Sequence, residues 1–202
     1  MGKAGKSGIT TNTPKNIMFG AGTIHKNLKY DAENKTWNFE ESIMGATQGG
    51  SKISIKPEFT DIEVDGALVA VKGLKVKTGE TASMEFNFLE ITKDVMKMAL
   101  VGTDGTSADE KFDLIESTAF ITEGEYLDNV AFVGQTLDGR NIIVIMDNAL
   151  CTSGFESEGK NKEAGVFICT FECHADLTSD MDTLPYHIYF PKSAEVPAEA
   201  EA

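Results

Sequence analysis

The sequence predicts a mostly β, α+β-class chain with one short helix, arranged as a β-sandwich or small barrel. Two observations lead to this prediction. Over most of the chain, apolar residues alternate with polar ones, the period-2 pattern of strands with one solvated face. Only residues 92–101 show the spacing of an amphipathic helix. A chain of 202 residues is long enough for one sizeable core without a disulfide or a metal ion to stabilise it.

The first part of the chain is polar and leads into weak alternation. Residues 1–15 are rich in Gly and Thr, and we expect a flexible basic arm. Residues 22–30 are predicted to form a strand, and residues 31–35 a turn. Trp37 and Phe39 then restart an apolar alternation.

The clearest strand signal lies in residues 52–64. Ile53 and Ile55 fall on one parity, and lysines and serine fall on the other. Pro57 favours an edge strand or a bend, because proline cannot donate a hydrogen bond to a neighbouring strand. The dipeptide at 65–66, Asp-Gly, is typical of a hairpin turn.

A second strand and the helix follow. Residues 81–89 alternate again and place Phe86 and Phe88 on one face. Thr92 is the predicted N-cap of the helix, and Gly102 suits its C-terminal cap. The predicted apolar stripe of the helix consists of Val95, Met96, Ala99 and Leu100.

The second half of the chain continues in strands and ends in an acidic segment. The Asp-Gly dipeptide at 138–139 is another hairpin signal. Residues 192–202 are rich in Ala, Pro and Glu, and we expect a disordered acidic tail. Strands are predicted at residues 112–121, 129–137, 141–146, 165–175 and 185–190.

Charge is distributed unevenly along the chain. The net charge is −14, yet residues 1–30 hold five lysines and no acidic residue. An acidic body argues against tight nucleic-acid binding, since that affinity comes largely from cations that neutralise phosphates. A basic arm on an acidic body suits contacts between subunits, and such contacts weaken with salt.

The sequence contains no targeting or membrane signal. No run approaches the roughly 18 apolar residues of a membrane helix. The basic N-terminus lacks the apolar core of a secretory signal, so we expect a cytosolic origin and no membrane insertion. Three cysteines are too few, and odd in number, for a disulfide framework.

A metal or redox site at Cys169, Cys173 and His174 is the first chemical hypothesis. Strand geometry favours another interpretation, because both cysteines share one strand face with Phe167 and Phe171, whereas His174 points the other way. Such thiols behave as small buried hydrophobic groups. The third cysteine, Cys151, is isolated in the sequence, and no closed set of four Cys and His ligands is visible.

No other pattern predicts chemistry. The Gly-x-Ser-x-Gly motif of a nucleophile elbow is absent, and the acidic residues of a possible calcium site lack the EF-hand spacing. Acidic pairs at 40–41 and 109–110 are best explained as solvated surface. We therefore predict no enzyme and no catalytic, cofactor-binding or metal-binding residue. The residues weighed for these roles are His25, His174, His187, Asp176, Asp180 and Asp182.

Several segments together resemble the major tail tube protein of long-tailed, siphovirus-type bacteriophages. The resemblance covers residues 16–191 and rests on patterns of glycines and apolar positions. These segments are Ile-Met-Phe-Gly-Ala-Gly at 17–22, Gly-Ala-Thr-Gln-Gly-Gly-Ser at 45–51, Ile-Glu-Val-Asp-Gly at 62–66 with Val-Lys-Gly at 71–73, Phe-Leu-Glu-Ile-Thr at 88–92 and Pro-Tyr-His-Ile-Tyr-Phe-Pro at 185–191.

The resemblance implies a structural virion protein with no cofactor. Such proteins have a β-sandwich with a flanking helix and assemble into hexameric rings that stack into a hollow tube. The implied partners are further copies of the chain, a tape-measure protein, tail tip and terminator proteins, and phage DNA that passes through the lumen without specific binding. The implied location is the phage tail, assembled in the host bacterial cytoplasm.

The family pattern also suggests where rings touch. A long loop and the terminal arms bridge adjacent rings in this family. Residues 40–66, with their Gly-rich run, are the candidate inter-ring loop, and the lysines of residues 1–15 are a second candidate contact with an acidic neighbour.

Two alternatives stay open. The inner tube of a contractile tail, a tailocin or a secretion device has the same fold, and a sheath protein encoded nearby would favour it. A cell-surface-binding β-sandwich module belongs to a different class. It predicts a secretory signal and exposed aromatic clusters, and neither is evident in the sequence.

Overall fold

The computed structural model describes residues 8–10, 12–158, 161–178 and 181–192. One seven-stranded antiparallel sheet dominates them. Its strands are β1 (Met18–Lys26), β4 (Thr47–Asp61), β5 (Lys75–Phe88), β8 (Leu127–Thr136), β9 (Asn141–Cys151), β10 (Phe167–Cys173) and β11 (Tyr186–Tyr189).

Two short hairpins and a few short helices complete the described chain. The hairpins are β2 (Tyr30–Asp31) with β3 (Thr36–Trp37), and β6 (Gly102–Gly105) with β7 (Leu114–Ser117). The helices are α1 (Thr13–Asn16), α2 (Phe39–Ser42), α3 (Lys93–Leu100) and the 3-10 turn η1 (Glu123–Glu125).

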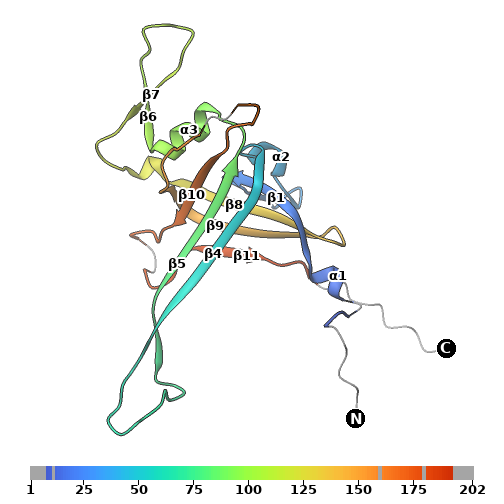
Figure 1. The fold of residues 1–202 in the computed structure, drawn as a ribbon, viewed down its shortest axis with the longest axis vertical. Coiled ribbons are helices and arrows are strands. Elements are labelled where there is room, and N and C mark those ends of the chain that lie inside the picture. Colours follow the sequence, from blue (N-terminus) through green and yellow to red (C-terminus); the bar gives the residue numbers. More distant parts are fainter. Residues whose placement is uncertain (1–7, 11, 159–160, 179–180, 193–202) are drawn as a thin grey trace, which may run out of the picture.

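The sheet folds over on itself to give a sandwich-like arrangement. Its strand order is β1-β8-β9-β10-β5-β4, and β11 pairs with β9 outside this path. In Figure 1, β4 and β5 cross β8 and β9 at a steep angle, so the two ends of the sheet form two layers. The predicted mostly β fold with a flanking helix is confirmed.

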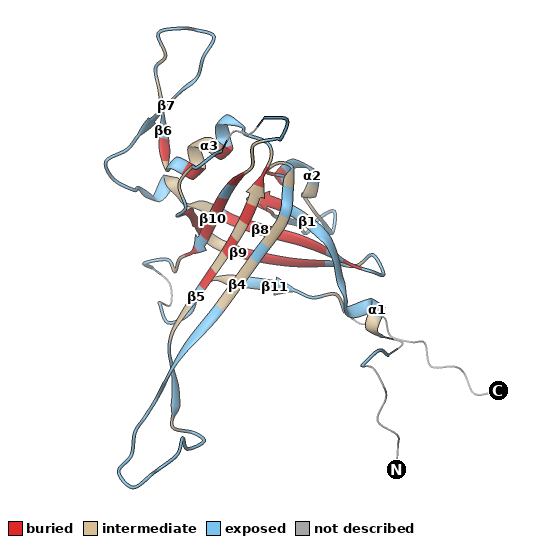
Figure 2. Ribbon diagram, viewed as in Figure 1, coloured by how far each residue is buried: buried red, intermediate tan, exposed pale blue. Residues whose placement is uncertain are grey.

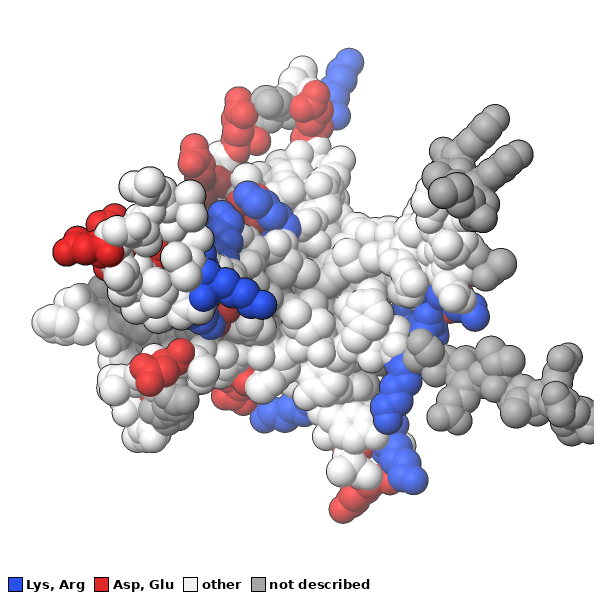
Figure 3. Space-filling model, turned by 90° about the horizontal axis from the view of Figure 1, so that it is seen from below, with Lys and Arg blue, Asp and Glu red and all other residues white. Residues whose placement is uncertain are grey.

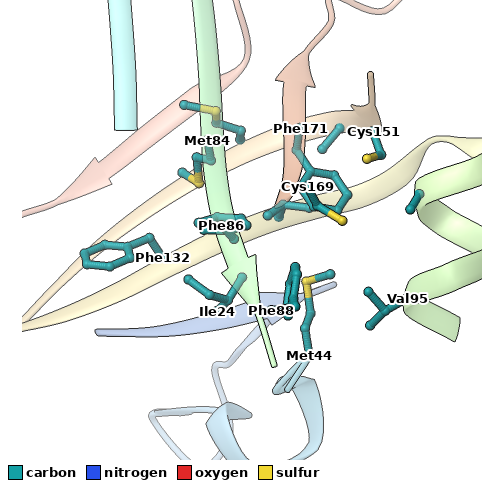
Figure 4. Close-up of a cluster of buried hydrophobic side chains, with 14 of the residues drawn as sticks. Ile24, Met44, Met84, Phe86, Phe88, Val95, Phe132, Cys151, Cys169 and Phe171 are labelled. Carbon is teal, nitrogen blue, oxygen red and sulfur yellow. The ribbon is translucent and has the colours of Figure 1, made fainter. Parts of the chain in front are cut away.

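The main core lies between these layers. Phe86 and Phe88 of β5 contact the aromatic rings of β10, with centroid distances of 6.0 Å from Phe86 to Phe171 and 5.5 Å from Phe88 to Phe167. All four rings are almost fully buried. Figure 4 shows Phe86 and Phe88 at successive levels along β5 within the cluster, with Val95 of α3 at one end of it. The predicted shared face of Phe86 and Phe88 is therefore the face that forms the core.

Strands β8 and β9 are buried on both faces. Val130 and Phe132 belong to the main core, while the alternate residues Ala131 and Val133 belong to a second cluster on the opposite face. Residues 28–39 cover this second cluster with Leu28, Trp37 and Phe39. Because both faces are covered, these strands show an almost unbroken apolar run instead of alternation.

Helix α3 matches its prediction at the start and departs from it at the end. Thr92 Oγ1 accepts a hydrogen bond from the Val95 backbone N–H at 3.2 Å, as an N-cap should. Val95 is buried, whereas Leu100 is exposed. The left-handed cap residue is Val101, with φ 48°, and not the predicted Gly102. Gly102 instead begins β6, where a Cβ would come within 2.8 Å of Ile115 Cγ2.

Replacing Thr92 with alanine should destabilise the protein by about 1 kcal/mol, because the Val95 N–H loses its partner. The measurement is the free energy of unfolding from urea denaturation. Thr103→Ala, at an exposed position of β6, is the matched control and should change stability by less than about 0.5 kcal/mol. Equal effects of the two substitutions would contradict the capping role.

Several predicted boundaries need correction. The strand predicted at 22–30 is β1, which starts at Met18 and ends before Asn27, a residue with φ 52°. Phe39 begins helix α2, so the apolar alternation that restarts at Trp37 does not continue as a strand, although both side chains pack against the second cluster. Of the strand predicted at 112–121, only 114–117 form one, whereas β9 runs beyond its predicted end to Cys151.

The ends of the chain are described in part. Residues 13–16 form α1, so the last turn of the predicted flexible arm is helical. Residues 1–7 and 193–202, which include nearly all of the predicted acidic tail, lie outside the described residues. Within the described part of the chain, no helix combines the length and apolar character needed to cross a membrane.

Candidate assembly surfaces

A long hairpin formed by β4 and β5 extends from the body of the protein (Figure 1). At its inner end, alternate residues of β5 from Ala82 to Phe88 are buried in the core. Toward its outer end, the same strands become exposed on both faces (Figure 2). A salt bridge between Lys75 and Asp61, 2.9 Å long, lies where the strands end. The hairpin is therefore anchored in the core at one end and free at the other.

The loop at residues 62–74, which we call the hairpin tip, is apolar and exposed. The Ile62 N–H donates to the Leu74 carbonyl at 2.7 Å and closes the loop. Leu68 is 98% exposed and Val69 is 78% exposed, and no charged residue occurs from 66 to 71. Exposed apolar groups gathered at one protrusion are typical of surfaces that another molecule covers.

The range predicted as a loop, residues 40–66, has a different local structure. Residues 47–61 form strand β4, and the range begins in α2. The Gly-rich run lies within β4, where Gly49 and Gly50 have φ near 90° and interrupt the register with β5. Only the last residues of the range belong to a true loop, the hairpin tip. A role of residues 40–66 in contacts between rings stays a prediction.

Strand β4 is the last strand on its side of the sheet. It pairs with β5 along its length, and the described residues place no strand on its other edge. Pro57 lies within it, as predicted for an edge strand. Lys52 and Lys56 also lie on this strand, and lysines of this kind discourage indiscriminate pairing of open edges. The free edge is a second surface on which another copy of the chain can pair.

Residues 102–125 form a second projection from the sandwich, which we call the acidic arm. It contains the β6–β7 hairpin and η1, and it holds seven carboxylates and one lysine. Two lysines of α3 fix its base: Lys97 pairs with Asp104 at 2.6 Å, and Lys93 pairs with Asp104 and Asp113 at 3.1 and 3.3 Å. Hydrogen bonds to both lysines lower the pKa of Asp104.

Arg140 links two residues that lie near the two ends of the described chain. It follows the turn at 138–139 and pairs with Asp138 at 2.8 Å. Its two remaining nitrogens donate to the carbonyls of Lys15, at 2.8 Å, and Lys192, at 3.2 Å. Nothing in the sequence indicated this contact beyond the predicted turn, because both partners are backbone groups far away in the chain.

Viewed from the hairpin side, part of the surface is uncharged. Figure 3 shows a broad uncharged area beside a group of Lys or Arg side chains near the middle of this face, with further charged side chains toward its margin. A surface of this kind suits contact with another protein better than contact with nucleic-acid phosphates.

The cysteines lie in the core, as strand geometry predicts. Cys151, Cys169 and Cys173 are buried as free thiols, and Cys169 lies among the core phenylalanines (Figure 4). Burial raises the pKa of Cys173 to about 12, so this thiol stays protonated at neutral pH. No group of three or more His, Cys, Asp or Glu suited to a metal ion is found in the part of the chain that the structure describes.

The three histidines have separate environments. His187 Nε2 lies 3.1 Å from Asp147 Oδ2, and His174 contacts the Tyr126 ring edge-on. Only His25 is fully buried, and its Nδ1 lies 2.8 Å from Ser42 Oγ.

The contact between His25 and Ser42 joins β1 to α2. The Ser42 hydroxyl donates to the Asn38 carbonyl at 2.8 Å, and His25 Nε2 lies 2.8 Å from Thr23 Oγ1. Ser42 is as buried as the histidine, so this pair is a structural link without access for a substrate. Burial lowers the pKa of His25, and a hydrogen bond with the Phe39 backbone partly offsets this effect.

The lowered pKa of His25 makes stability depend on pH. Below the unfolded-state value of about 6.5, the unfolded chain binds a proton that the folded protein resists. Stability is therefore fully present at pH values well above 6.5 and should fall as the pH decreases to 5.5, by no more than about 1.4 kcal/mol. Urea denaturation at both pH values measures this loss. His25→Asn should flatten the dependence, whereas the control His174→Asn should retain it; an unchanged slope in His25→Asn would contradict the assignment.

Comparison with known proteins gives distant structural likenesses. No family model and no curated protein matches the sequence. The fold is similar to a chain in the virion of a native gene transfer agent particle, with 13% identity over 77% of this chain and 92% of that chain and a TM-score of 0.42. A chain in the tail of an empty gene transfer agent particle with C6 symmetry has 11% identity, the same coverage and the same TM-score. A crystal structure of an Hcp protein has 12% identity over 74% of this chain and 86% of that chain, with a TM-score of 0.33.

Proposed function

We propose that this chain is a structural tube subunit of a phage tail, which assembles into stacked hexameric rings around a hollow lumen. The observation that carries the proposal is the β4–β5 hairpin, whose apolar tip is left exposed by the described residues of its own copy. A protrusion anchored in the core and apolar at its free end is suited to insertion into a neighbouring copy. The resemblance of residues 16–191 to tail tube proteins supports the same function.

Ring formation would use the free edge of β4. An open strand edge can pair with another sheet, and closure of a ring removes every such edge. Stacking of identical rings joins two different surfaces of each copy, which is an open, heterologous assembly. The hairpin tip and the acidic arm lie toward opposite ends of the longest axis in Figure 1, as head-to-tail stacking requires.

The remaining parts of the proposal concern the tube as a whole. The net charge of −14 per copy would repel phosphates, so phage DNA would pass through the lumen during genome ejection without specific binding. A tape-measure protein and tail tip or terminator proteins would be the other partners. The protein would be located in the virion tail after assembly in the bacterial cytoplasm, and no enzymatic step is part of its role.

The inner tube of a contractile tail, a tailocin or a secretion device is the second candidate. The hairpin and the free edge of β4 would make the same contacts between copies in such a tube. A co-purifying sheath protein would favour this candidate. A cell-surface-binding module is the alternative from another class, and the exposed Phe112 and Phe120 are the residues that favour it.

Negative-stain electron microscopy of the concentrated full chain at moderate salt tests the proposal. Hollow tubes with a regular axial repeat and sixfold end views are the expected result. Addition of preformed tail tips provides a nucleus where spontaneous assembly is slow. A monomer that stays monodisperse with and without tips, while binding to bacterial cells, would contradict the tube and favour the surface-binding module.

A further inference from the structure

The acidic arm carries more negative charge than the described residues of its own copy neutralise by ion pairs. Its net charge is −6, and within the described part of the chain the lysines of α3 pair with Asp104 and Asp113 alone among its carboxylates. Glu110 and Glu116 are exposed and have no Lys or Arg within ion-pair distance among the described residues. Like charges gathered on one projection repel one another, so a cationic partner would stabilise the arm.

The same arm exposes large apolar side chains. Phe112 is 69% exposed and Phe120 is 82% exposed, and Ile121 beside them is exposed as well. Isolated exposed apolar residues are common, but two phenylalanines on one acidic projection indicate a surface that is covered in the assembled state. The partner must therefore supply both positive charge and apolar groups.

Residues 1–15 of the chain have this composition. They carry three lysines and no acidic residue, and Ile9 is 75% exposed. The hairpin tip is a poorer match, because it holds two carboxylates and only one lysine. Helix α1, where residues 1–15 join the body, lies on the opposite side of the molecule from β6 and β7 in Figure 1. Because the described point of attachment is remote from the acidic arm of its own copy, the acidic arm of another copy is the partner to consider.

We infer that the acidic arm, residues 102–125, is the docking site for residues 1–15 of a second copy of this chain. Lys3 and Lys6 pair with carboxylates such as Glu110 and Glu116, and Ile9 covers the exposed phenylalanines. This inference rests on the proposed function, because it assigns the two sides of one contact between stacked rings.

The composition of residues 193–202 makes them a competing partner for the lysines of residues 1–15. Residues 193–202 carry three glutamates, and Arg140 holds Lys192 next to Lys15. The lysines of one end of the chain could then pair with the glutamates of the other end. A test has to separate this partner from the acidic arm.

A labelled peptide with the sequence of residues 1–15 provides the first test, by fluorescence anisotropy with the full chain. We expect saturable binding that weakens with salt and drops about tenfold in Glu110→Lys/Glu116→Lys. Neither glutamate accepts a side-chain hydrogen bond among the described residues, so the fold should tolerate the change. Glu33→Lys/Glu163→Lys changes the net charge equally at exposed sites elsewhere and should bind as the wild type. Equal binding by both variants, or loss of binding only in Glu195→Lys/Glu199→Lys/Glu201→Lys, would overturn the inference.

Charge exchange in assembled tubes provides the second test. Lys3→Glu/Lys6→Glu should raise the protein concentration needed for tubes about tenfold, and adding Glu110→Lys/Glu116→Lys to it should restore the wild-type concentration. Carbodiimide treatment of tubes made from mixed light and heavy protein should join Lys3 or Lys6 to acidic-arm residues of another copy. If wild-type tubes form but neither the charge exchange nor the crosslinking gives the expected result, the inference fails and the proposed function stands. If no tubes form, the proposed function fails, and the peptide titration still decides the inference.

Discussion

Leu68→Asp/Val69→Asp should abolish tube assembly and leave the folded monomer unchanged. Both side chains are exposed at the hairpin tip, so neither contributes to the core of its own copy. Burial of two apolar side chains in a neighbour contributes about 3 kcal/mol or more, and a buried unpaired carboxylate would cost further free energy. Every copy in an open assembly would lose this contact free energy, so the tubes should no longer form. The measurement is the yield of tubes in negative stain, with circular dichroism as the check of folding.

Leu177→Asp is the matched control for the hairpin tip. Leu177 is exposed to a similar degree but lies in the loop after β10, far along the chain from the hairpin. This variant should assemble as the wild type does. Normal tubes from the Leu68 and Val69 variant would show that the tip is not buried between copies, and would remove the observation on which the proposed function rests.

Phe86→Ala should destabilise the protein by about 3–5 kcal/mol, which is a large part of the stability of an ordinary domain. Phe86 has no exposed surface, and its ring lies 6.2 Å from Phe88 and 6.0 Å from Phe171. Truncation leaves a cavity between the two layers that surrounding side chains fill only in part. The free energy of unfolding from denaturant titration measures the effect.

Phe59→Ala is the matched control, because it also removes a phenylalanine side chain, but from the outer part of the same hairpin. Phe59 is exposed on β4, so its loss should change stability by less than about 0.5 kcal/mol. It should instead affect assembly, because it lies on the protruding half of the hairpin. Similar losses of stability in both phenylalanine variants would contradict the division of the hairpin into a core half and a projecting half.

The sequence alone determined the local structure where one face of a helix or strand is exposed to solvent. The alternation at 52–64 and 81–89 predicted β4 and β5, and Pro57 correctly predicted an edge strand. Thr92 marked the start of α3, because N-capping depends only on residues within one turn. The buried cysteine face of β10 followed from the two-residue period of a strand.

Tertiary structure decided what depends on contacts distant in the chain. Phe39 fits a strand alternation, yet it begins a helix because it covers the second cluster on β8 and β9. Val101 adopts the left-handed conformation because Gly102 is needed where β6 packs against Ile115. Local propensities are worth about 1 kcal/mol or less per residue, so packing of this kind overrides them.

The candidate assembly surfaces also depend partly on the sequence and partly on the tertiary structure. The uncharged run at 66–71 and the excess of acidic residues at 102–125 are properties of neighbouring residues, yet neither segment was singled out as a surface from the sequence. Only the folded chain places these two segments toward opposite ends of the molecule and brings Lys15 and Lys192 together at Arg140. The physical reason is that strand pairing and layer packing fix directions in space, whereas the sequence fixes only the order and chemistry of the residues.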